Sequence, residues 1–181
     1  KDMFRFESPV DFRRMRLFIA GDLAIGEKEA NDYTAFAVGA LDYDDQLHII
    51  EVIRFRRDTF GIVEALLDLV EKYDPYLVGI EKGKREHAIK PQLRKRMKER
   101  RIFPTLAEGD KALKPIQDKL KRARPLQGRM QQGMVYFPLP EYAPWVETTQ
   151  NEMLRFPGGV HDDMVDAMAW LLRMTMNEEP P

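Results

Sequence analysis

The distribution of apolar residues predicts three strands in the first third of the chain. Residues 16–25 form one apolar run, and residues 34–41 form a second. Residues 46–56 alternate between apolar and polar positions, which is the period of a strand with one buried face. Short polar turns, at 26–31 and 42–45, separate these segments. The pattern therefore predicts a meander of antiparallel strands.

Helical spacing begins after the meander. Residues 59–73 carry apolar side chains three and four positions apart, with Thr59 as a candidate N-cap and Pro75 as a stop. Residues 76–81 form another run that is apolar up to Glu81, and a strand that follows a helical crossover should lie parallel to the first strand. Further elements are expected as a basic helix at 90–101 with Pro91 in its first turn, a short fifth strand at 102–106, an interrupted helix at 112–132, an extended segment at 134–137, and helices at 145–154 and 162–176.

This element order predicts one α/β domain at residues 16–177, with a five-stranded mixed sheet flanked by helices. Residues 1–15 show no clear period and are expected to be a leader or linker, and residues 178–181 a tail. The 181 residues are 44% hydrophobic and 33% charged, and none is cysteine, which excludes disulfides and thiolate zinc sites. No apolar run approaches the roughly 20 residues of a membrane span, so no membrane partner is expected.

Charge is distributed unevenly although the net charge is only −1. Ten lysines and arginines stand against two glutamates in residues 82–101, and seven stand against one aspartate in residues 111–129. Residues 141–181 hold eight acids and two arginines. This asymmetry favours an anionic polymer that binds the basic part of the chain and reaches the acidic part. Solvated helix faces would give the same pattern.

Acidic residues stand at three places where an unpaired carboxylate is costly to bury. Asp22 interrupts the first apolar run, Glu81 closes the fourth strand, and a cluster of three aspartates opens the last helix. Asp162 suits an N-cap, but Asp166 lies a turn further in, where capping does not explain it. Two carboxylates about 4 Å apart repel by roughly 4 kcal/mol at an effective dielectric of about 20. A cation would turn this repulsion into attraction.

The predicted topology brings these acids together. Parallel neighbouring strands would set Asp22 beside Glu81, and the last helix can bring Asp163 to the same point. An all-oxygen set of ligands suits Mg²⁺ or Mn²⁺ and not structural zinc. Two such ions, about 3.5–4 Å apart, can activate a water molecule and stabilise the leaving oxygen in phosphodiester cleavage. The alternative is that these acids are solvated strand ends, turn residues or helix caps.

Five short motifs, taken in order, point to a known family. They are Gly21-Asp-Leu-Ala24 with Asn31-Asp-Tyr-Thr34, Val78-Gly-Ile-Glu81, Asp118-Lys-Leu-Lys-Arg-Ala123, Gly133-Met-Val-Tyr-Phe-Pro138 and His161-Asp-Asp-Met-Val-Asp-Ala167. Together they resemble the C-terminal nuclease domain of the large terminase subunit of tailed bacteriophages. The resemblance implies a ribonuclease H-like fold and a metal-dependent endonuclease that cuts concatemeric double-stranded viral DNA during genome packaging.

The resemblance also implies roles for particular residues. Two ions, Mg²⁺ or Mn²⁺, would be held by Asp22, Glu81 and Asp163. Further candidate ligands are Asp162 and Asp166, and Asp32 and His161 are candidates for residues that contact the ligands. The candidate DNA contacts are Lys82, Lys84, Lys119 and Arg122.

Other partners follow from the same resemblance. The segment Gly21 to Gly26 only approaches a phosphate-binding loop, because Glu27 stands where that loop needs lysine. An ATPase domain is therefore expected before Lys1, with the small terminase subunit and the portal as partners in the host bacterial cytoplasm. The alternatives are a Holliday-junction resolvase of similar build and a non-catalytic module that binds DNA or the portal. An ATPase of the actin–hexokinase type would need a second half, which 181 residues do not provide.

Overall fold

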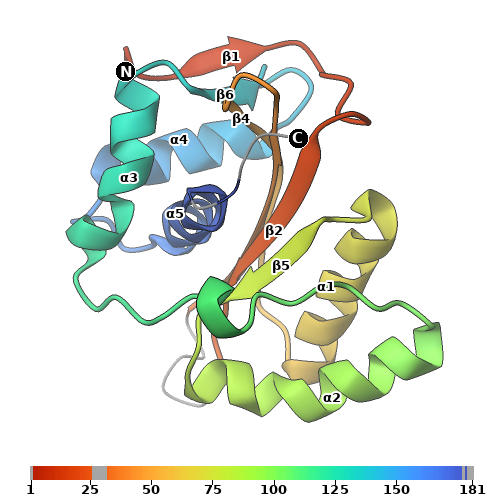
Figure 1. Ribbon diagram of the computed structural model, residues 1–181. Coiled ribbons are helices and arrows are strands. Elements are labelled where there is room, and N and C mark those ends of the chain that lie inside the picture. The colour runs from red at the N-terminus through yellow and green to blue at the C-terminus, as the bar shows by residue number, and fades with distance from the viewer. Residues whose placement is uncertain (1, 26–31, 177, 179–181) are drawn as a thin grey trace.

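The computed structural model describes residues 2–25, 32–176 and 178. These residues build one mixed sheet of six strands in the order β1-β6-β4-β3-β2-β5 (Figure 1). The strands are β1 (Arg5–Glu7), β2 (Arg16–Asp22), β3 (Thr34–Leu41), β4 (Leu47–Phe55), β5 (Leu77–Ile80) and β6 (Val135–Pro138). Strand β3 is antiparallel to β2 and β4, and all other neighbours are parallel. The carboxyl ends of β2, β4 and β5 therefore meet at one edge of the sheet.

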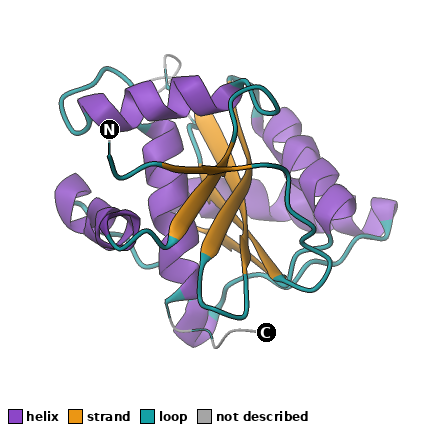
Figure 2. Cartoon of the chain, turned by 90° about the horizontal axis from the view of Figure 1, so that it is seen from above, coloured by secondary structure: helices purple, strands orange, loops and turns teal. Residues whose placement is uncertain are grey.

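Helices cover both faces of this sheet, as Figures 1 and 2 show. One layer contains α1 (Thr59–Tyr73) and α2 (Lys84–Arg100), and the other contains α3 (Lys119–Gln131), α4 (Trp145–Arg155) and α5 (Asp163–Thr175). A short 3-10 turn, η2, spans Gly109–Lys111. None of the helices in the described ranges is long and apolar enough to cross a membrane.

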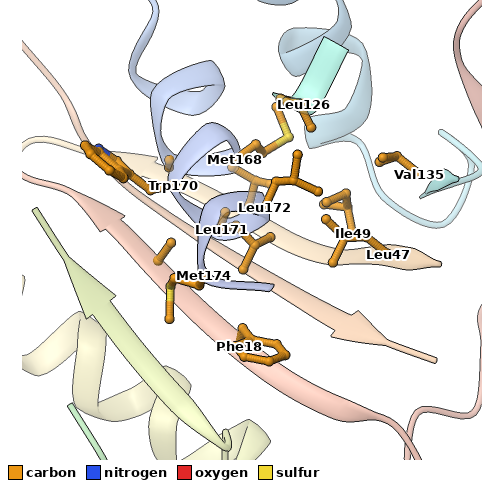
Figure 3. Packing of buried hydrophobic residues seen from close by; sticks show 14 of the residues in the cluster. Phe18, Leu47, Ile49, Leu126, Val135, Met168, Trp170, Leu171, Leu172 and Met174 are labelled. Carbon is orange, nitrogen blue, oxygen red and sulfur yellow. The ribbon is translucent and has the colours of Figure 1, made fainter. Parts of the chain in front are cut away.

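Each face of the sheet has its own apolar core. Phe18, Trp170 and Leu171 belong to the core between the sheet and α5 (Figure 3). Ile19 and Leu66 belong to the core beneath α1 and α2. Neighbouring residues of β2 thus enter opposite cores, because side chains alternate along a strand. The buried helix α5 lies directly on the sheet, and it fixes which acids can reach the sheet edge.

The structure corrects the number of strands from five to six. Strand β1 forms within the segment expected to be a leader, and its Phe6 pairs with Phe137 of β6. Residues 102–106 form no strand, because Leu106 makes only a single parallel bridge, to Val78. The domain limits at residues 16 and 177 remain predictions.

One helix cap and two helix starts also differ from the prediction. Helix α1 is capped by Asp58 and not by Thr59, since Asp58 Oδ1 accepts a hydrogen bond from the Gly61 amide at 2.8 Å. Helix α2 begins at Lys84, so Pro91 lies inside it and not in its first turn. Helix α3 begins only at Lys119, later than the expected residue 112. The turn expected at 26–31 lies outside the described residues, as do 179–181 of the expected tail.

Candidate active site

Asp22 and Glu81 lie at the carboxyl edge of the sheet on neighbouring parallel strands. The register pairs Gly21 of β2 with Ile80 of β5, so Asp22 and Glu81 are the next pair along the two strands. Neighbouring strands lie about 4.8 Å apart, which sets the two side chains next to each other. The side-by-side placement predicted from the topology is therefore confirmed for these two acids.

Both carboxylates point to the face of the sheet that α5 covers. Ala20 packs in the core under α5, and Asp22 follows two residues later on the same face. A Cβ atom on Gly79 would meet Met174 Sδ of α5 at 2.6 Å, so Gly79 and, two residues later, Glu81 also face α5. Asp22 and Glu81 line one cavity of about 350 Å³, together with Lys82, Lys84 and Arg85 among others.

Asp163, the first residue of α5, presents a buried oxygen to this region. Its side chain is almost completely buried, and its Oδ2 has no hydrogen-bond partner. Burial, together with the nearby charges of Glu152 and Asp162, raises the pKa of Asp163 to about 6. A buried carboxylate oxygen without a partner is unusual in a folded protein. Oδ2 therefore has an unused acceptor position, with His161 Nδ1 4.0 Å away.

Asp166 is held by a buried arginine. Its Oδ1 accepts from Arg122 Nε at 3.2 Å and from Nη2 at 2.7 Å, and Arg122 Nη1 donates to the Ile116 carbonyl at 2.5 Å. Burial raises the pKa of Asp166, and the Arg122 guanidinium only partly opposes this. Arg122 was predicted to be a DNA contact. The structure buries it beside the acids, so a solvated helix face is wrong for this residue.

The acids from the sheet and from α5 share one electrostatic environment. Burial raises the pKa of Asp22 well above its ordinary value, and the charges of Asp166 and Asp163 raise it further. Burial lowers the pKa of Arg122, but Asp166, Asp22 and Glu81 raise it overall. These couplings join β2, β5 and α5 at one place. The couplings agree in direction with the predicted convergence, and the sharing of ions by these acids stays a prediction.

The acids do not form a complete metal-binding cluster in this structure. Within the described part of the chain, no three histidine or acidic side chains stand close enough to form one. The chemistry of the donors nevertheless fits a hard divalent cation, since Asp22, Glu81 and Asp163 offer only oxygen and Asp163 Oδ2 lacks a partner.

The remaining predicted acids and histidine lie around this group. Asp162 forms an ion pair with Lys119 and makes no side-chain cap hydrogen bond. Asp32 is exposed, and its charge contributes to the raised pKa of Asp163. His161 Nδ1 lies 4.0 Å from Asp163 Oδ2. These positions suit residues that surround the ligands, and their roles remain predictions.

The predicted basic contacts divide into two kinds. Lys82 lies between Glu86 Oε1, at 3.2 Å, and Glu108 Oε2, at 2.5 Å, whereas Lys84 is exposed at the start of α2. Lys119 and Arg122 instead face the aspartates of α5. Contact of any of these four with DNA remains a prediction.

Sequence reasoning missed Glu152 of α4. Its buried Oε1 accepts from the amides of Met164, at 2.8 Å, and Val165, at 3.0 Å, and Oε2 accepts from Arg54 at 3.1 Å. Glu152 therefore supplies the N-terminal hydrogen bonds of α5 that were expected from Asp162. The sequence feature that could have identified Glu152 is its position on the buried face of an amphipathic helix, three residues after the buried Thr149.

A mixed sheet with carboxylates at the carboxyl edge, enclosed by two helix layers, is the arrangement of ribonuclease H-like nucleases. The model of the terminase RNaseH-like domain family matches residues 19–175. The chain belongs to this family, which supports a nuclease role in viral genome packaging. No curated protein matches the chain significantly.

Solved structures agree on the fold. The large terminase nuclease of thermophilic phage G20c, with bound magnesium, is 18% identical with a TM-score of 0.63, over 97% of this chain and 94% of that one. The manganese-soaked, inhibitor-bound human cytomegalovirus terminase nuclease domain is 14% identical with a TM-score of 0.66, over 98% and 91%. T. thermophilus RuvC in complex with a Holliday junction is 11% identical with a TM-score of 0.50, over 92% and 99%. The predicted ribonuclease H-like fold is confirmed.

Proposed function

We propose that this domain hydrolyses phosphodiester bonds of double-stranded DNA with two divalent cations held by Asp22, Glu81 and Asp163. The observation that carries the proposal is the buried, unpartnered Oδ2 of Asp163, on a residue whose charge raises the pKa of Asp22. The nuclease of phage G20c was solved with magnesium and that of cytomegalovirus was soaked in manganese, which supports the same ions here. Asp162 is the alternative ligand to Asp163, and Asp166 is a further one.

Cations of this kind, when bound, would activate a water molecule and stabilise the leaving oxygen of the cleaved strand. The chain supplies the positions. Strands β2 and β5 hold Asp22 and Glu81 side by side, and Glu152 fixes the first amides of α5 and thereby Asp163. Arg122 would keep Asp166 in place, while Lys82 and Lys84 would meet the phosphates of the duplex.

In the virus, this activity would cut concatemeric DNA at the start and end of packaging. We propose that the domain then works with an ATPase domain, a small terminase subunit and the portal, in the host bacterial cytoplasm. The membership of the chain in a terminase family supports this setting.

The test is the degradation of supercoiled plasmid with Mn²⁺ or Mg²⁺, in the presence and absence of EDTA. Asp22→Asn should abolish cutting, because it removes a ligand and keeps the size of the side chain. Asp44→Asn is the matched control, since Asp44 is an exposed aspartate in the β3–β4 turn, at the opposite edge of the sheet. Equal cutting by Asp22→Asn and the parent would refute the catalytic assignment.

A junction resolvase is the second candidate, because T. thermophilus RuvC shares the fold. Cleavage of a four-way junction and of a linear duplex of the same arms separates the two. A strong preference for the junction would favour the resolvase.

A further inference from the structure

A basic and aromatic cluster borders the acidic edge of the sheet on the β4 side. The Tyr33 ring, just before β3, has the guanidinium carbon of Arg54 at 4.4 Å from its centre and that of Arg56 at 4.1 Å. His161 meets the same ring edge-on, with ring centres 5.1 Å apart. Tyr33, Arg54 and Arg56 are called the arginine–tyrosine cluster below.

The sheet register places this cluster in line with the acids. Asp22 of β2 pairs with Ala35 of β3, and Ala35 pairs with Arg54 of β4. Directly opposed residues of antiparallel strands project to the same face of a sheet. Arg54 therefore shares the α5 face with Asp22, and two strand spacings put their backbones about 10 Å apart. The bond from Arg54 to Glu152 of α4, at 3.1 Å, confirms that face.

His161 connects the cluster to the acids. His161 contacts Tyr33 on one side and lies 4.0 Å from Asp163 Oδ2 on the other. Tyr33 follows Asp32, whose charge reaches Asp163. The cluster thus borders the proposed site of hydrolysis and is not a separate patch.

The cluster gathers two guanidinium groups against one aromatic ring. Arg54 gives one nitrogen to Glu152, and the side chain of Arg56 is exposed. Guanidinium groups are flat, multi-donor ligands for phosphate, and a tyrosine ring holds them in place by cation–π contact. On the β5 side, Lys84 and Arg85 line the cavity of Asp22. Cations therefore flank the acids on both sides along one sheet edge.

We propose that the arginine–tyrosine cluster binds a backbone phosphate of the DNA strand beside the phosphodiester that is cut. This inference rests on the proposed nuclease function and adds the residues that hold the strand on the β4 side. Such a contact positions the strand and reads no sequence, so its effect is the same for any duplex.

The experiment measures binding of a fluorescent duplex in EDTA, where cleavage is prevented, over a range of salt concentrations. Arg56→Ala should weaken binding by about tenfold and lower the slope of log K against log salt by about one. Arg56→Lys should keep the slope, because the charge remains, and lose part of the affinity. Tyr33→Phe should bind as the parent does, because the ring remains, whereas Tyr33→Ala should bind more weakly.

Arg13→Ala is the matched control for charge. Arg13 is an exposed arginine just before β2, at the opposite end of that strand from Asp22. It should leave both affinity and slope unchanged. Melting curves identify variants that fail to fold, and Arg56→Gln replaces Arg56→Ala if the alanine variant does.

The outcomes separate this inference from the proposed function. A folded Arg56 variant with the affinity and slope of the parent overturns the inference, and so does an equal loss in Arg13→Ala. If the parent still cuts plasmid with metal in that case, the nuclease function stands. A parent chain that neither binds nor cuts duplex DNA overturns both.

Discussion

Replacing Asp163 with asparagine should stabilise the metal-free protein at neutral pH. The carboxylate is buried, its Oδ2 has no partner, and its pKa is raised from 3.8 to about 6. Each pKa unit corresponds to about 1.4 kcal/mol, so the charged form costs at most about 3 kcal/mol. The amide of asparagine remains polar and buried, which reduces the expected gain to about 1–2 kcal/mol. For a domain of this size that is a rise in Tm of about 2–8 °C.

The sign of the pH dependence follows from the raised pKa. Below pH 3.8 the Asp163 side chain is protonated in both the folded and the unfolded chain, so asparagine brings no electrostatic gain. As the pH rises from 3.8 to about 6, the unfolded aspartate ionises first, and the parent loses stability relative to Asp163→Asn. Above about pH 6 the difference is constant. Denaturant unfolding in EDTA at several pH values measures this, with Asp44→Asn as the control.

Added Mg²⁺ or Mn²⁺ should reverse the order of stability. A cation that binds only the folded site stabilises the parent by mass action, and Asp163→Asn should gain little. Asp163→Asn could instead be less stable than the parent in EDTA at pH 7, by an amount that does not change with pH. In that case the Asp163 carboxylate stabilises the metal-free fold. That result would refute the reasoning from the unpartnered oxygen.

Four other substitutions test the groups around the site and the sheet. Arg122→Met leaves the Asp166 carboxylate buried without its cation, so thermal melting should show a loss of about 3 kcal/mol, and adding Asp166→Asn should recover part of it. Glu152→Ala removes the acceptor of two α5 amides, and hydrogen exchange should show these amides losing about 2 kcal/mol of protection. Burial lowers the pKa of His48, but hydrogen bonds to two carboxylates raise it overall above 6.5. The stability that His48 contributes should be full below pH 6.5 and fall as the pH rises through the folded pKa, and His48→Gln should abolish that dependence in melting curves.

Local periodicity was sufficient for the long elements of the fold. The helix predicted at 59–73 and the strand predicted at 34–41 have those bounds in the structure, because each forms one continuous buried stripe or run. The short strand β1 could not be found in this way. Its three residues show no period, and it exists because it pairs with β6, far along the chain. Pairing of that kind is decided by the assembled sheet and not by local sequence.

The site shows the same division between local and tertiary information. Asp22 and Glu81 stood out because a carboxylate beside a buried strand is anomalous in any context. The partner of Arg122 and the cap of α5 depend on how three helices meet. Asp162 stands at the position expected for an N-cap. In the structure, Glu152 of α4 accepts the hydrogen bonds of the α5 amides, and Asp162 forms an ion pair with Lys119. Where two acids compete for the same donors, only the packed structure decides between them.

The balance of charge explains why these acids remain together in the folded chain. Arg122 neutralises Asp166, whereas burial, and after it the charges of neighbouring acids, keeps the pKa values of Asp22 and Asp163 raised. Helix α5 cannot relieve this by moving away, because the Glu152 hydrogen bonds fix its first turn and Leu171 packs closely over Gly39 of β3. Burial and, to a smaller extent, repulsion therefore make ionisation of Asp22 and Asp163 unfavourable. A divalent cation between the strands and α5 would offset the unfavourable free energy of ionising these carboxyl groups. The packing that destabilises the carboxylates without metal would therefore favour binding of the ion.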